Sequence, residues 1–192
     1  MALTKIRGAG AEGLTLSSTA LTVANGLTLT DGNIALASGH GVSFASTSDL
    51  SGMASELFDD YEEGDFTPTM TPSSSGSINL ANNVDRLSYT KVGRLVHIHG
   101  LLETTSKSSP VGNQINIATL PFTPVDATEY AGRGGGGISC SNVAGNSGFT
   151  VQPYYILEGA AVIYLRLDAS TLHPGGSPAY SQFYFDITYV TS

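Results

Sequence analysis

The sequence is poor in residue types on which many proteins depend. Its 192 residues include one cysteine, Cys140, and no tryptophan. A single cysteine excludes an intrachain disulfide, and its strand-like surroundings predict a small buried side chain rather than a reactive thiol. Charged residues make up 12% of the chain, against a usual share of roughly 25%. A surface built instead from Ser, Thr, Asn and Gly is typical of extracellular or particle-exposed β proteins.

The chain also lacks a basic patch and a long apolar run. Eight Lys and Arg are scattered among sixteen Asp and Glu, so we expect no nucleic-acid partner and no attraction to anionic membranes. No apolar stretch approaches the ~20 residues that span a bilayer, and residues 1–13 lack the apolar run of a secretory signal. We therefore expect no membrane insertion, and a protein released from a cytoplasm by another route, such as within a virion.

Between residues 14 and 48 the chain repeats a short apolar–small–apolar unit. Period-two alternation places both apolar side chains of a unit on one face of a short strand. One copy leaves this face uncovered, whereas three copies wound about an axis would bury it. The repeat predicts an intertwined trimeric β stalk, with a single-chain β-solenoid or a meander of the next domain as alternatives. The residues expected to face the axis are Leu14, Leu16, Leu21, Val23, Leu27, Leu29, Ile34, Leu36, Val42 and Phe44.

An acidic joint follows the stalk, over residues 49–65. Its first ten residues predict a short helix capped by Asp49. Five of the sixteen acids then fall between Asp59 and Asp65. Two interpretations are open: a solvated acidic turn, with the rings of Tyr61 and Phe66 packed under the next domain, or a Ca²⁺ site built from clustered carboxylates.

The segment from residue 66 to residue 192 predicts an antiparallel β-sandwich head of jelly-roll type. About eight short runs alternate apolar and polar residues, Gly and Pro separate the runs, and no long helical period is present. Leu87–Val92 and Leu95–Leu102, for example, predict a hairpin about Gly93. The expected fold is therefore all-β, with a trimeric β stalk followed by a β-sandwich head.

The end of the stalk and the joint resemble a segment of bacteriophage tail fibre proteins, especially those of marine and cyanobacterial phages. In that family a G-x-G-[IV]-x-F rung ends a repetitive β stalk, and L-D-D-Y-E-E-G-T-[FW]-T-P-T precedes a β-rich distal head. Phe58 and Asp65 depart from this pattern, because Leu and Thr are usual there. The residues that carry the resemblance are Gly39-His40-Gly41-Val42-Ser43-Phe44-Ala45-Ser46-Thr47 and Ser55-Glu56-Leu57-Phe58-Asp59-Asp60-Tyr61-Glu62-Glu63-Gly64-Asp65-Phe66-Thr67-Pro68-Thr69.

The resemblance implies a homotrimeric virion component, on the tail or another particle surface, whose head meets the host. Residues 1–13 precede the stalk and are the candidate for attachment to other virion proteins. The predicted function is a non-enzymatic fibre that binds a host-surface receptor, a glycan or a protein, with a glycan expected. The alternatives are a structural virion spacer or decoration protein without receptor binding, and a small polysaccharide-degrading enzyme. No nucleophile-elbow or paired-carboxylate spacing supports the enzyme, so no catalytic residue is predicted.

Candidate receptor-binding residues lie in the predicted loops of the head. Loops on a β scaffold commonly carry recognition, so we expect contacts at residues 105–111, 126–136 and 169–181. Sugars stack on aromatic rings and hydrogen-bond to polar side chains. Tyr130, His173 and Tyr180 are therefore the candidates, although the absence of Trp weakens a lectin assignment.

Two further motifs bear on cofactors. His97 and His99 share one face of a predicted strand, so six imidazoles could hold a metal ion on a trimer axis. The alternative is that they belong to the polar outer face of the strand. Gly132–Gly137 matches G-x-G-x-x-G but lacks the following helix that a dinucleotide site requires. We expect a flexible or closely packed loop there, and no cofactor.

Overall fold

The computed structural model describes Thr28 and residues 33–37, 40–43, 57–58, 60–143, 146–172 and 181–192. The chain divides into two units, Met1–Leu36 and Ala37–Ser192. In the first unit, the described side chains of Ile34 and Leu36 are 65% and 52% exposed. Most of the predicted stalk, the segment 1–13 and the predicted helix as far as residue 56 lie outside the described residues. Among the described residues, no helix is long and apolar enough to cross a membrane.

The second unit consists of antiparallel strands, which confirms the all-β prediction. β1 (Val42–Ser43) pairs with β2 (Leu57–Phe58), so residues 57 and 58 lie in a strand and not in the predicted helix. Short 3-10 turns occupy Thr128–Tyr130 and Ala169–Thr171. The other strands are β3 (Tyr61–Phe66), β4 (Thr69–Pro72), β5 (Ser75–Leu80), β6 (Leu87–Val92), β7 (Leu95–Val111), β8 (Ile115–Ala118), β9 (Gly134–Val143), β10 (Asn146–Ile156), β11 (Val162–Leu165) and β12 (Gln182–Val190).

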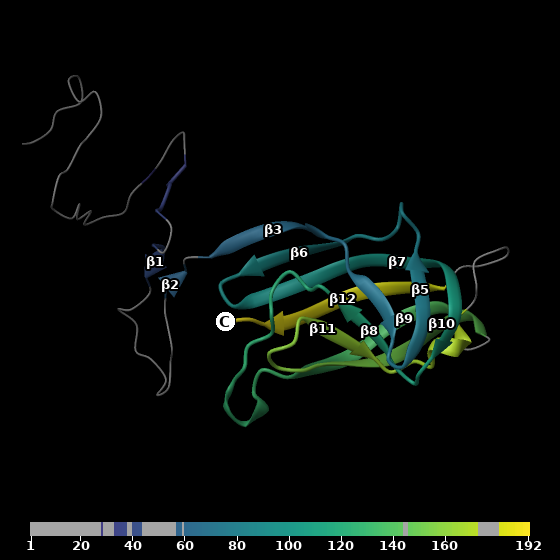
Figure 1. Ribbon diagram of the computed structural model, residues 1–192. Helices are drawn as coiled ribbons and strands as arrows, with labels where there is room; N and C mark the ends of the chain where they lie inside the picture. The colour runs from purple at the N-terminus through teal and green to yellow at the C-terminus, as the bar shows by residue number, and fades with distance from the viewer. Residues whose placement is uncertain are drawn as a thin grey trace, which may run out of the picture. The chain divides into compact units, whose positions relative to one another are not determined.

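These ten strands form a single curled sheet. Its order is β3-β6-β7-β12-β9-β10-β11-β8-β4, and β5 joins it by pairing with β7. Figure 1 shows β6, β7 and β12 side by side in one layer, with β8, β10 and β11 in another. The two layers expected of a sandwich are therefore parts of one continuous ladder, because strand twist accumulates along a wide sheet and curls it.

The core fills the space between the layers and follows from period-two alternation. On β12, Phe183, Phe185, Ile187 and Tyr189 are buried, and the residues between them face outward. Side chains from both layers meet in one cluster. Its fully buried members include Leu87, Ile98, Leu102, Ile115, Ile117, Ile138, Ile156, Ile163, Leu165, Leu172 and Phe183.

The hairpin predicted about Gly93 is confirmed. Val92 pairs directly with Leu95, and Gly93 has a φ of 55°, which glycine adopts without a steric penalty. The prediction of a loop at residues 105–111 is wrong, because this segment is the second half of the 17-residue strand β7. Its run of Thr, Ser and Lys gives little indication of a strand. Pairing with β5 nevertheless provides hydrogen-bond partners for its main-chain N–H and C=O groups.

The acidic run is also a strand and not the predicted turn. From Tyr61 it forms β3, paired with β6. Its carboxylates bond to side chains of β6: Glu62 accepts from the Tyr89 hydroxyl at 2.5 Å, and Asp65 from the Ser88 hydroxyl at 2.6 Å. The run is thus part of the head's sheet. Among the described residues, no group of three or more His, Cys, Asp and Glu is placed to hold a metal ion.

Candidate functional site

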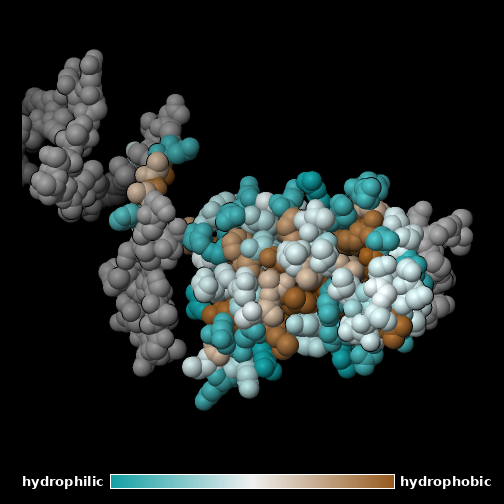
Figure 2. Space-filling model, in the orientation of Figure 1, coloured by the Kyte–Doolittle hydropathy of each residue, from teal (hydrophilic) through white to brown (hydrophobic). Residues whose placement is uncertain are grey.

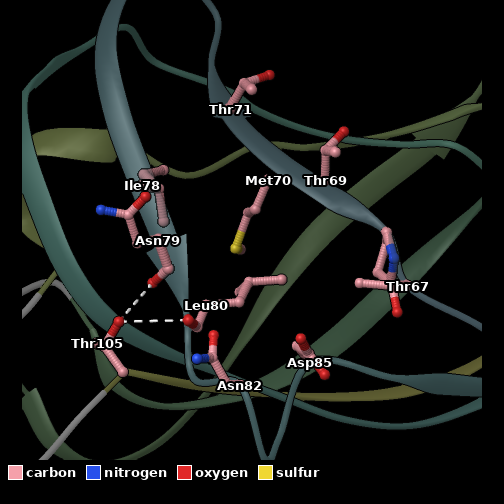
Figure 3. Close-up of a pocket in the computed structure, with 11 residues that line it drawn as sticks. Thr67, Thr69, Met70, Thr71, Ile78, Asn79, Leu80, Asn82, Asp85 and Thr105 are labelled. Carbon is pink, nitrogen blue, oxygen red and sulfur yellow. Dashed lines mark hydrogen bonds between the residues drawn. The ribbon is translucent and has the colours of Figure 1, made fainter.

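A cleft opens where two consecutive strands diverge. β4 pairs with β8 while β5 pairs with β7, so the strands leave their connecting turn toward different partners. The space between them measures about 580 Å³. Figure 3 shows the Met70 side chain reaching into this cleft, while Thr69 and Thr71 turn the other way. The alternation of β4 therefore directs the Met70 side chain into the cleft, and Thr69 and Thr71 are also among its lining residues.

Polar and apolar side chains both line the cleft. Asn79, Asn82 and Asp85 supply amide and carboxylate groups. Thr105 Oγ1 donates to the main-chain oxygens of Asn79 and Leu80, each at 3.3 Å (Figure 3). Ligand pockets for ring-shaped molecules usually add an aromatic surface, and none of the cleft's lining residues is aromatic. The cleft therefore lacks the aromatic surface on which a sugar ring would stack.

A second surface combines aromatic rings with hydrogen-bonding groups. We call it the tyrosine face: the outward side chains of Gln114, Asn116, Tyr155, Tyr164 and Arg166. Asn116 lies opposite Tyr164, and Tyr164 lies opposite Tyr155, on three neighbouring strands. The two tyrosine rings stack with centroids 5.0 Å apart and an interplanar angle of 15°. Such a cross-strand aromatic pair fixes both rings.

One glutamine holds the tyrosine face together. Gln114 Oε1 accepts from the Tyr155 hydroxyl at 2.7 Å and from Arg166 Nη1 at 3.4 Å. Gln114 Nε2 donates to Asn116 Oδ1 at 2.8 Å. The tyrosine hydroxyl and the guanidinium therefore converge on a single oxygen. The network positions both groups without burying them, since Arg166 is exposed and Tyr155 is half-buried.

A glycine leaves the far side of Tyr155 open. Tyr155 lies opposite Tyr164 on one side and opposite Gly135 on the other. A Cβ at Gly135 would lie 3.9 Å from the Tyr155 Cβ and 3.0 Å from the Tyr154 carbonyl oxygen. Any side chain there would stand beside the ring. The prediction of a loop at residues 132–137 is wrong from Gly134 onward, because these glycines begin β9.

Tyr130, a predicted receptor-binding residue, ends the short 3-10 turn that precedes this glycine strand. Its ring is 65% exposed, and the Arg133 guanidinium carbon lies 3.8 Å from the ring centroid. Glu158 anchors the turn by accepting from the Gly132 N–H at 2.8 Å, and its other oxygen lies 3.8 Å from Arg133 Nε. Glu129 and Tyr130 have positive φ angles of 57° and 63°, a strained conformation that needs such anchoring.

His173 and Tyr180, the other two predicted receptor-binding residues, lie outside the described residues. Sequence reasoning missed Tyr155 and Tyr164, which lie on strands and not in loops. A usable signal was present: each alternates with buried residues, Ile156 after Tyr155 and Ile163 and Leu165 around Tyr164. Alternation alone places these rings outward.

The predicted metal-binding pair lies on a different surface. We call it the histidine face: the outward side chains of β3, β6, β7 and β12 around His97 and His99. The two rings stack with centroids 5.7 Å apart. His97 Nδ1 lies 3.2 Å from Thr188 Oγ1, and its Nε2 lies 3.8 Å from Asp186 Oδ1. The structure confirms that His97 and His99 lie on one face of β7. A metal ion held by them on a trimer axis stays a prediction.

Acidic side chains and hydroxyls surround these histidines. Neighbouring strands align Asp65, Ser88, His99 and Asp186 in one cross-strand row. A shallow hollow of about 380 Å³ lies over part of this row. On the side drawn in Figure 2, polar and near-neutral residues surround small hydrophobic patches.

The cysteine occupies the core, as its surroundings predicted. Cys140 on β9 is fully buried, and burial raises the pKa of its thiol to about 12. A nucleophilic cysteine needs the opposite shift, since the thiolate is the reactive form. Cys140 is therefore a packing residue.

No protein-family model and no curated protein matches the sequence. Among solved structures, the chain is similar to that described as "Crystal structure of Dettilon tailspike protein (gp208)", with a TM-score of 0.41 and 19% sequence identity. The similarity covers 67% of this chain and 24% of that chain. The chain thus spans about a quarter of the length of the tailspike that it matches. A TM-score this low does not establish a shared fold.

Proposed function

We propose that this chain is a bacteriophage tail protein, located in the virion, whose β head binds a glycan on the host surface. The single observation that supports glycan binding best is the open side of Tyr155 above Gly135, beside an oriented set of hydrogen-bonding groups. The resemblance of residues 39–69 to phage tail fibres supports the assignment to a phage tail and the location in the virion. The proposed role is binding without bond cleavage.

The acidic run fits this proposal as an architectural element. Asp60 forms an ion pair with Lys91, whose side chain is buried. Glu62 and Asp65 bond to Tyr89 and Ser88 on the same neighbouring strand. The motif that resembles phage fibres thus supplies the first strand of the head, and recognition falls to other parts of the sheet.

The binding mode follows from the chemistry of the tyrosine face. A pyranose ring presents one face of C–H groups, which packs on an aromatic ring such as Tyr155, and hydroxyls around its edge. Asn116 and Arg166 supply N–H donors to these hydroxyls. An amphipathic aromatic ring beside fixed amide groups suits a ligand that has both an apolar face and hydrogen-bonding hydroxyls.

The proposal includes a homotrimer held by the N-terminal repeat. Ile34, Leu36 and Val42 are each at least half exposed in the single chain, and burial of apolar side chains among three copies would stabilise the assembly. Multi-angle light scattering of the full chain should give three times the mass of one chain. A stable, folded monomer would contradict the trimer without bearing on the tyrosine face.

Glycan binding is tested with the full chain and two variants. Wild-type protein is titrated against a panel of bacterial cells and their purified surface polysaccharides. We expect Tyr155→Ala to weaken binding about five- to thirty-fold, because a stacked ring contributes on the order of 1–2 kcal/mol. Tyr61→Ala is the matched control, since Tyr61 is 60% exposed on β3 and lies outside the tyrosine face.

Two results would contradict this function. If wild-type protein binds no cell and no polysaccharide but still associates with phage particles, a structural spacer explains the chain better. If Tyr155→Ala and Tyr61→Ala bind equally well, recognition lies elsewhere on the head. Release of reducing sugar from a bound polysaccharide would instead require an enzyme.

A further inference from the structure

We propose that the tyrosine face selects saccharides that carry a carboxylate, with Arg166 as the counter-ion. This inference rests on the proposed glycan binding and narrows its ligand to acidic sugars. It comes from the hydrogen-bond inventory of the tyrosine face and from a comparison of its arginine with the other arginine that lies beside a tyrosine.

The side-chain amide oxygens of the tyrosine face already accept hydrogen bonds from its own residues. Several of its N–H donors remain available to a ligand. The oxygen of Gln114 is taken by Tyr155 and Arg166, and the oxygen of Asn116 is taken by Gln114. A guanidinium has five N–H donors and no acceptor, and an amide nitrogen has two donors. The groups that remain to meet a ligand are the N–H groups of Arg166 and Asn116 and the Tyr164 hydroxyl, which can donate or accept. A surface of this kind favours a ligand rich in acceptors.

The positive charge of Arg166 also favours a ligand with a carboxylate. In the described part of the chain, no carboxylate lies within 4.0 Å of the Arg166 side chain, whereas Arg133 lies 3.8 Å from Glu158 and Lys91 pairs with Asp60. Arg166 is exposed, and its only side-chain bond among the described residues is the long one to Gln114. Arg86, Arg94 and Lys107 also have no carboxylate within 4.0 Å among the described residues. What distinguishes Arg166 is its hydrogen bond to the glutamine that also holds Tyr155.

The spacing suits a single sugar residue. Tyr155 and Arg166 both contact one oxygen atom, at 2.7 and 3.4 Å, so the hydroxyl and guanidinium lie within reach of one monosaccharide. A uronic acid stacked on Tyr155 could therefore direct its carboxylate to Arg166. Guanidinium and carboxylate form paired, charge-assisted hydrogen bonds, which are stronger than bonds between neutral groups. Neutral sugars would gain only the stacking and the weaker bonds.

The test uses the full chain and an immobilised set of uronic-acid oligosaccharides. Each acidic oligosaccharide is presented beside the same oligosaccharide with its carboxylates reduced to alcohols. We expect the acidic members to bind about ten-fold more tightly than their reduced counterparts, and the preference to shrink as salt rises. Arg166→Gln should abolish the preference, because it weakens binding of the acidic members about ten-fold more than binding of the reduced members, whereas Arg166→Lys should keep part of it.

Arg133→Gln is the matched control, because Arg133 also lies beside a tyrosine but has Glu158 as its partner. It should keep the preference for acidic members. Folding of Arg166→Gln is checked by its melting temperature; the side chain is exposed and its main-chain N–H still donates to Pro153.

Other outcomes separate this inference from the function on which it rests. Equal binding of acidic and reduced members, or a preference that survives Arg166→Gln, would overturn the carboxylate inference and leave glycan binding intact. Loss of the preference in Arg133→Gln would overturn its assignment to Arg166. Binding of neither set would contradict both proposals.

Discussion

The tyrosine face and the histidine face are two outer surfaces of the same sheet, and they present opposite chemistry. The tyrosine face offers N–H donors beside stacked rings, and its guanidinium has no carboxylate partner among the described residues. The histidine face offers the carboxylates of Asp65 and Asp186 around two imidazoles. Both rest on one shared core. The comparison teaches that the inward-facing side chains of each strand determine the fold, whereas the outward-facing side chains are free to determine which ligand binds.

The shared core gives the largest expected effect. Phe183 on β12 is fully buried, opposite Leu102 and Cys140. Phe183→Ala should lower the free energy of unfolding by about 3–5 kcal/mol, through lost burial and a residual cavity. Denaturant unfolding measures this loss, and Thr90→Ala on the histidine face should stay within about 0.5 kcal/mol of wild type. A loss below about 1 kcal/mol would show that Phe183 does not support both layers.

A partly buried ion pair on the inner side of β6 gives an intermediate effect. The Lys91 side chain is 6% exposed and pairs with Asp60, whose side chain is 48% exposed. Asp60→Asn removes the carboxylate that pairs with this buried ammonium, so we expect a loss of about 1–3 kcal/mol. Glu63→Gln alters only an exposed bond to Tyr61 and should cost under about 0.5 kcal/mol. Saccharide binding at the tyrosine face should be unchanged in both folded variants, and weaker binding would mean that the faces are coupled.

A buried tyrosine behind the histidine face gives the smallest effect, visible only in alkali. Burial raises the pKa of Tyr189 from 10.0 to about 12, and its hydroxyl donates to the Phe122 carbonyl at 2.8 Å. The unfolded chain therefore releases this proton first as the pH rises. The resulting stability is fully present below about pH 10 and is lost toward about pH 12, on the order of 1–2 kcal/mol.

Tyr189→Phe isolates this contribution. The variant should be less stable than wild type near neutral pH because a hydrogen bond is lost. Its deficit should shrink when unfolding is measured at about pH 11, where wild type has begun to lose the tyrosine contribution. A deficit that is the same at both pH values would mean that Tyr189 ionises alike in the folded and unfolded chains. Cys140 titrates in both proteins and cancels in the comparison.

The limits of prediction follow from where each signal resides. The all-β class and the hairpin at Gly93 come from local alternation and turn residues, which the sequence displays directly. The second half of β7 and the strand β3 have weak local signals, because their residues are mostly Ser, Thr, Asp and Glu. Their main-chain groups are satisfied by partners distant in the chain or across a turn. Tyr130 was correctly placed on an exposed turn, whereas Tyr155 and Tyr164 were overlooked because loops alone were searched.

The sequence by itself determined that this protein is all-β and which side of most strands faces the core, since alternation with period two is a local property. Only the tertiary structure decided that Tyr155 lies between Tyr164 and Gly135, and that Gln114 joins Tyr155 to Arg166. Those neighbours depend on the pairing and register of strands far apart in the chain. A shift of one residue in register would turn each of these side chains to the other face.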